Sequence, residues 1–223
     1  MLRDDPERCA TQGYDPAVAV DDTQAAFAHA AAGDGIVLES RTFDWLCEQG
    51  HVGLERVAKA RRDPALVAPV VAALEVLGAI YARLGGDISV LHASRANLLL
   101  TAGLVHVPSG TLIEVDGAPR FTSCRLQALE LYPPTAVLGF DIDEYRQLCR
   151  SLCAQSDRLS RGMPAKGFGF GGVPKERAYH DALFDLATPA MGHPPLVRIP
   201  AVDGDGAAAY RRSRDSLLAL SAA

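Results

Sequence analysis

The feature that most constrains the fold is a long apolar helical pattern between two clear boundaries. Asp63-Pro64 predicts its start, because Asp caps free backbone N–H groups and Pro fits the first helical position. Gly85-Gly86 predicts its end. The apolar residues that recur at helical spacing between these points are Val67, Val70, Val71, Leu74, Leu77, Tyr81 and Leu84. The stretch also contains Pro69, Glu75 and Arg83, so we interpret it as a buried helix and not as a membrane span.

Beyond this helix the hydrophobic period changes from helical to two, which is typical of strands. The strands predicted from this pattern lie near residues 88–93, 103–107, 111–115, 119–127 and 136–140. Ser109-Gly110 and Asp116-Gly117 lie between apolar runs, and such pairs predict tight hairpins because both central residues of a type I′ turn need positive φ. The segment 87–140 is therefore expected to form an antiparallel β-meander.

Helical patterns lie on both sides of this meander. The helices predicted before it cover residues 23–32, 40–50 and 51–62, with a short strand at 35–39 between the first two. Those predicted after it begin at Asp141, Glu176 and Ala207. A last strand at 196–202 contains Pro200, which predicts an edge position. No linker or repeat divides the chain, so we expect a single α+β domain over residues 1–223, with residues 1–22 loosely ordered.

Composition excludes some classes of protein. The chain has 223 residues, 48% of them hydrophobic, which is enough for a sizeable core. Its net charge of −5 argues against a nucleic-acid-binding protein, which needs a broad basic face. Five cysteines without a CxxC pair, and a polar start without a secretory signal, predict a cytoplasmic protein without membrane contact. The abundance of Ala, Gly and Arg indicates a GC-rich bacterial genome.

The segment 136–177 places acidic groups, glycines and basic groups close together in sequence. An apolar run ends in three acids, Asp141, Asp143 and Glu144. If the strand continues through these residues, Asp141 and Asp143 point to one face and can share a divalent cation such as Mg²⁺ with Glu144, or act as a catalytic base. The alternative is a capping box, in which Asp141 caps a helix and Glu144 follows three residues later.

A glycine-rich basic loop at 161–177 follows the helix that begins at Asp141. Its GxGxxG pattern is not a dinucleotide fingerprint, because a helix and a Pro-containing loop precede it where a strand is required. The loop is expected to bind an anion or to act as a lid, or else to be a plain surface loop. The candidate ligand contacts are Lys166, Gly167, Gly169, Lys175 and Arg177.

Two short elements of this segment, GFDIDE at 139–144 and PKER at 174–177, resemble elements of the phosphopantetheinyl transferases. In that family acidic groups bind magnesium and a lysine meets phosphate. The resemblance implies Asp141, Asp143 and Glu176 as metal ligands and Lys175 as a phosphate contact. It covers about ten residues, and the family's upstream Ser-His-Ser element is absent, so the chain is not assigned to the family.

We therefore expect a small-molecule enzyme of transferase type. Its ligand would bear phosphate or carboxylate and bind between the Asp141–Glu144 turn and the 161–177 loop. This requires the chain to double back, so that Lys175 and Arg177 lie beside Asp141. The alternative is a non-catalytic binding or accessory subunit that docks a partner through the same loop. Substrate, metal and oligomeric state stay open.

Overall fold

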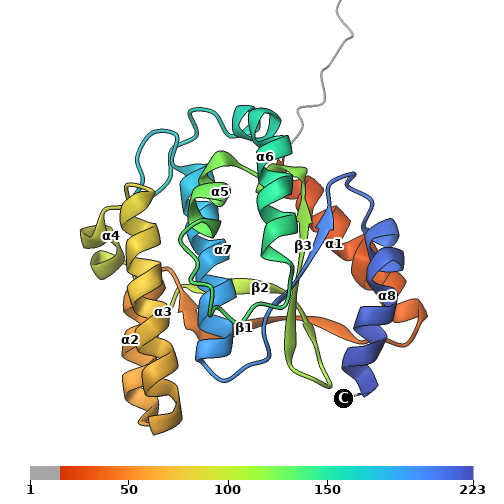
Figure 1. The fold of residues 1–223 in the computed structure, drawn as a ribbon, viewed down its shortest axis with the longest axis horizontal. Helices are drawn as coiled ribbons and strands as arrows, with labels where there is room; N and C mark the ends of the chain where they lie inside the picture. Colours follow the sequence, from red (N-terminus) through yellow and green to blue (C-terminus); the bar gives the residue numbers. More distant parts are fainter. Residues whose placement is uncertain (1–15, 223) are drawn as a thin grey trace, which may run out of the picture.

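The computed structural model describes residues 16–222, which form a four-stranded mixed sheet with helices packed on both faces (Figure 1). The strands are β1 (Leu38–Cys47), β2 (Leu99–His106), β3 (Thr111–Gly117) and β4 (Val197–Ala201). The helices are α1 (Pro16–Gly33), α2 (Gly50–Arg61), α3 (Pro64–Arg83), α4 (Ile88–Ala93), α5 (Ser123–Leu129), α6 (Ile142–Leu159), α7 (Val173–Ala190) and α8 (Gly206–Ala222), with a 3₁₀ turn, η1, at Ala118–Arg120. The predicted α+β class is confirmed.

The sheet order is β1-β2-β3-β4. The first three strands pair antiparallel, and the predicted Ser109-Gly110 turn joins β2 to β3, with His106 opposite Thr111. The fourth strand departs from the predicted meander, because β4 pairs parallel with β3. It is an edge strand, as Pro200 predicted.

Helices on the two faces of the sheet form two separate hydrophobic cores. One core contains α2, α3, α5, α6 and α7, and the other contains α1 and α8. Strand β3 alternates between them: Leu112 belongs to the first core, and Ile113 and Val115 belong to the second. The intervening Glu114 and Asp116 are also buried, so this strand places two carboxylates inside the molecule.

Two predicted elements that precede β2 in the chain are wrong. Residues 40–50 were predicted as helix but belong largely to β1, where Phe43, Trp45 and Cys47 recur at every second position and pairing with β2 decides the conformation. Residues 88–93 were predicted as strand but form α4, because the Asp87 carboxylate caps this short helix by accepting from the Ser89 backbone N–H.

The second predicted hairpin is also wrong. Strand β3 continues through Asp116-Gly117, which lies opposite Pro200 and Ala201 of β4. Residues 119–127 are not a strand: η1 occupies 118–120, and the Thr122 hydroxyl then caps α5. Residues 136–140, also predicted as strand, form none.

The helix predicted first, α3, begins and ends where expected, and the Asp63 carboxylate accepts from the Ala65 N–H. Its apolar stripe is only partly buried: Leu77 is fully buried, whereas Val67 and Val71 are 61% and 50% exposed. By length and composition alone α3 could cross a membrane, and 28% of its most apolar window is buried. Helix α1 begins at Pro16. The loose order predicted for residues 1–22 stays a prediction, and residues 1–15 lie outside the described part of the chain.

Candidate functional site

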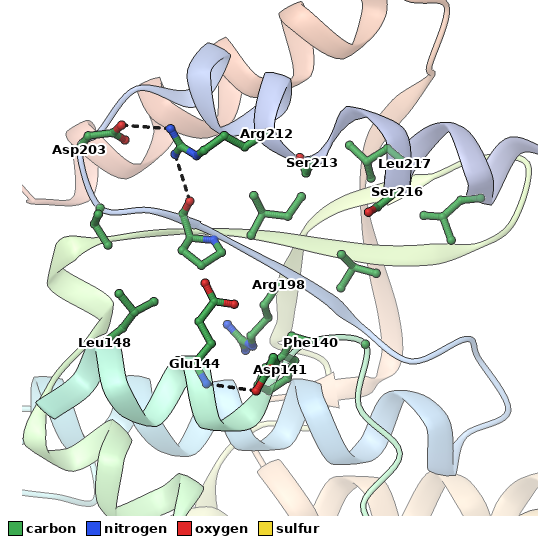
Figure 2. A pocket seen from close by; sticks show the side chains of 16 residues that line it. Phe140, Asp141, Glu144, Leu148, Arg198, Asp203, Arg212, Ser213, Ser216 and Leu217 are labelled. Atoms are coloured by element: carbon green, nitrogen blue, oxygen red, sulfur yellow. Dashed lines mark hydrogen bonds and ion pairs between the residues drawn. The ribbon is translucent and has the colours of Figure 1, made fainter. Parts of the chain in front are cut away.

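The predicted acidic turn is a helix cap. The Asp141 carboxylate accepts hydrogen bonds from the backbone N–H groups of Asp143 (2.8 Å) and Glu144 (3.1 Å) at the start of α6. Asp143 is exposed and pairs with Arg146 at 2.9 Å. Figure 2 shows the Glu144 carboxylate in a cavity of about 670 Å³ between α6, β4 and α8, where Arg212 is paired with Asp203.

The glycine-rich loop lies at the other end of α6 (Figure 1). An 18-residue helix is about 27 Å long, so the chain does not double back to set the loop beside Asp141. The loop is anchored instead: the Gly167 carbonyl accepts from the Asp87 N–H, and Gly169 exchanges backbone hydrogen bonds with Ala165. The Gly169 amide therefore has a backbone partner, and the Lys175 ammonium lies near Gly85.

The metal ligands implied by the phosphopantetheinyl transferase resemblance do not meet. Asp141 and Glu176 lie in different cavities, and Asp143 points to solvent. Within residues 16–222 no group of three or more His, Cys, Asp and Glu side chains is placed to bind a metal ion. The expected magnesium site therefore has no ligand set in this part of the chain.

A buried network of charged side chains lies between the sheet and α7. At its centre the Arg198 guanidinium donates to Asp185 (2.6 Å), Asp116 (2.9 Å) and Asp181 (3.3 Å). Arg125 and Arg120 complete it by pairing with Asp185 (2.6 Å) and Asp181 (3.2 Å). Burial alone would raise the pKa of Asp181, but the guanidinium groups around it lower that pKa to about 2.

Glu114 is the additional acid of this network. The three arginines already balance the three aspartates, so an ionised Glu114 would add an uncompensated buried charge. Burial raises the pKa of Glu114 against the opposing charges of Arg120 and Arg198, and the charge of Asp116 adds to the rise. One carboxyl oxygen accepts from the Gly103 N–H at 2.8 Å. Any Cβ at position 103 would lie within 3.0 Å of Glu114 and Gln24, so the glycine makes room for both.

Two adjoining cavities open above this network, and we call them together the Arg–His cleft. The larger, about 400 Å³, includes among its lining residues Gln24 of α1, Ser40 of β1, Gly103 of β2, Glu114 of β3, Arg120 of η1, and Arg177, His180 and Asp181 of α7. The smaller, about 240 Å³, includes Glu48, Tyr81, Lys166, Phe168, Glu176 and Tyr179. Leu100 and His180 line both cavities, which therefore meet at these two side chains.

Two side chains of the cleft lack the partners that their chemistry requires. Within residues 22–220 no carboxylate pairs with the half-buried Arg177 guanidinium. Burial and the nearby charge of Arg120 lower the pKa of Arg177, and they outweigh the opposing effect of the Asp181 and Glu176 carboxylates. The His180 imidazole likewise has no hydrogen bond within the same residues, and burial lowers the pKa of His180 to about 4. At neutral pH the cleft therefore presents an uncompensated cation beside a neutral imidazole.

The predicted contacts divide between cavities. Lys166 and Glu176 line the smaller part of the cleft and Arg177 the larger part, whereas Asp141 and Glu144 line the separate cavity between α6 and α8. Glu114, Arg120 and His180 were not predicted. A signal for part of the site was present in α7, where Asp181 and Asp185 stand one turn apart beside the inward residue Ala182.

Comparisons of the chain with protein-family models, with curated proteins and with solved structures found no match.

Proposed function

We propose that this protein is a small-molecule enzyme whose ligand presents an anionic group to Arg177 and Arg120 in the Arg–His cleft. The observation that supports this most is the Arg177 guanidinium, which has no acidic partner within residues 22–220 and lies close enough to Arg120 for its pKa to be lowered. Like charges held together in a cavity favour a bound anion, because a carboxylate or phosphate neutralises them and accepts paired N–H bonds.

The same cleft offers groups for proton transfer. His180 is neutral at pH 7, and an anion bound beside it would raise its pKa from about 4 towards neutrality, where an imidazole is an effective base. Glu114 has a raised pKa and can donate its carboxyl proton to a ligand oxygen. These roles suit group transfer, in which the attacking hydroxyl or amine gives its proton to His180 as the new bond forms, and the leaving group takes the Glu114 proton as its own bond breaks. We retain a transferase as the reaction class.

A second candidate function is a non-catalytic accessory subunit that docks a partner through the 161–177 loop. One observation favours it: Phe170, at the tip of this loop, is 85% exposed. An aromatic side chain exposed to this extent is free to pack against a partner. Under this alternative, Phe170→Ala would abolish partner capture without changing anion binding.

The proposal is tested with inorganic phosphate, acetate, butyrate and hexanoate as probes, by thermal shift and calorimetry on the full chain. Arg177→Gln should weaken binding of the preferred anion about 10- to 100-fold, because a charged hydrogen bond contributes about 1.5–3 kcal/mol. Arg150→Gln, at an exposed arginine of α6, is the matched control and should bind like the wild type. Equal affinities of the two variants, or no binding of any probe to the wild type, would contradict the proposal.

A further inference from the structure

The Arg–His cleft has a positive end and a negative end. Arg120 and Arg177 line the larger cavity, and Glu48 and Glu176 line the smaller one. Because Arg120 is paired with Asp181 and Glu48 with Lys166, Arg177 is the excess charge at the first end and Glu176 at the second. The pKa of Glu176 is raised by burial and by the charge of Glu48, while the pKa of Arg177 is lowered by burial and by Arg120. Each excess charge is therefore in an environment that a counter-charge would stabilise.

The acidic end accommodates an ammonium group. The Lys166 side chain of the 161–177 loop places its Nζ atom 3.6 Å from the Glu48 carboxylate, while the lysine side chain stays 60% exposed. Glu176 makes no ion pair within residues 22–220. One loosely held ammonium therefore faces two carboxylates, and Lys166 can leave through solvent when a ligand amine replaces it.

The wall next to these acids is aromatic. Tyr81 contacts Phe168 at 5.0 Å and Tyr179 at 4.7 Å between ring centroids, and all three rings line the smaller cavity. Carboxylates beside aromatic rings are a favourable setting for an organic cation, which gains charge pairing and contact with π-systems together. The anchored Gly167 and the buried Phe168 hold this part of the loop in place.

The charge of the positive end limits how much negative charge a bound anion can carry. Arg120 is paired with Asp181, which belongs to the balanced network, so Arg177 supplies the single uncompensated charge among the described residues of the larger cavity. A singly charged carboxylate neutralises it. A doubly charged phosphate monoester would leave an excess negative charge above buried aspartates, which is costly at low dielectric.

We infer that the ligand of the Arg–His cleft is a small amino carboxylate. Its carboxylate lies at Arg177 and Arg120, its ammonium replaces that of Lys166 at Glu48 and Glu176, and its middle lies against His180 and Leu100. This inference rests on the proposed function, because it uses the same cleft, and it adds the class of substrate.

Calorimetry with matched probes tests this directly. The probes are β-alanine, 4-aminobutyrate and 6-aminohexanoate, each compared with the carboxylate of the same chain length that lacks the amine, and with the corresponding n-alkylamine. We expect at least one amino carboxylate to bind the wild type ten-fold or more tightly than both of its matched probes. Equal affinities of amino carboxylates and plain carboxylates would overturn the inference while leaving the anion site intact.

Two variants separate the ends of the cleft. Glu176→Gln should weaken amino carboxylate binding ten-fold or more and leave plain carboxylates unchanged, whereas Arg177→Gln should weaken both. Glu75→Gln, at an exposed position of α3, is the control for loss of an acid. If Glu176→Gln affects both ligand classes equally, or neither, the cationic subsite is refuted. If no carboxylate of either kind binds in an Arg177-dependent way, the proposed function fails as well. Should a variant misfold, the wild-type comparison alone decides.

Discussion

Two groups of charged side chains that line cavities differ in how their charges are satisfied. In the cavity between α6 and α8, Asp141 caps a helix, Arg212 is paired with Asp203 and Glu144 is exposed to water (Figure 2). In the Arg–His cleft, Arg177 and His180 are half-buried without such partners among residues 22–220. The difference teaches that a concentration of charge in the sequence does not define a site. A charge that is partly desolvated and left uncompensated is the more informative sign.

The largest effect is expected in the buried network beneath the cleft, whose central Arg198 also lines the cavity between α6 and α8. Arg198→Met should destabilise the fold by about 3–5 kcal/mol, because it leaves three buried aspartates without their shared cation. Arg212→Met, at the exposed pair of the other cavity, should cost about 1 kcal/mol or less. Urea unfolding measures both. Similar losses would show that the buried network contributes no more than a surface pair.

A smaller effect is expected in the pH dependence of stability. The pKa of His180 falls from its ordinary 6.5 to about 4 on folding, so the unfolded state binds more protons between these values. The contribution of His180 to the free energy of unfolding should be fully present above pH 6.5. It should be lost by on the order of 3 kcal/mol as the pH falls to about 4.

His180→Asn should remove this share of the decline. The comparison between wild type and variant is needed because the pKa values of His51, His106 and His193 are also lowered, and these histidines act in the same direction. Parallel stability curves for the two proteins between pH 4 and 6.5 would show that His180 is not desolvated as the structure indicates.

The smallest effect should come from the acidic turn. Asp141→Ala should cost about 1 kcal/mol, the usual contribution of a helix cap, without changing anion affinity. Asp143→Ala, which removes a solvent-exposed pair with Arg146, should cost less than about 0.5 kcal/mol. Chemical denaturation and calorimetry on the two variants test this. A loss of ligand binding in either variant would show that the turn takes part in the functional site.

Local signals predicted the parts of the fold that local interactions determine. Asp63-Pro64 and Gly85-Gly86 bound α3, and Ser109-Gly110 joins β2 to β3. The failures came where distant partners decide the conformation. Residues 40–47 are extended because β2 pairs with them, and Asp116-Gly117 continues a strand because β4, eighty residues later in the chain, lies beside it.

The site was less predictable than the fold. The alternation of Glu114 and Asp116 with the apolar residues Ile113 and Val115 is typical of a strand with one face in water. Here α7 covers that face, and Arg198 of β4 pairs with Asp116. Only Lys166, Glu176 and Arg177 of the predicted contacts line the cleft, because a single loop and the helix it leads into supply them. Its other charged groups come from elements far apart in sequence, and only the folded chain brings them together.

The central claim is that the Arg–His cleft, and not the cavity beside the acidic turn, binds the ligand. Calorimetry of Arg177→Gln and Glu144→Gln tests it, using whichever of acetate, butyrate, hexanoate or phosphate binds the wild type most tightly. We predict an affinity loss of about 10- to 100-fold for Arg177→Gln and wild-type affinity for Glu144→Gln. Wild-type affinity in Arg177→Gln would contradict the account, and a loss confined to Glu144→Gln would move the site to the cavity between α6 and α8.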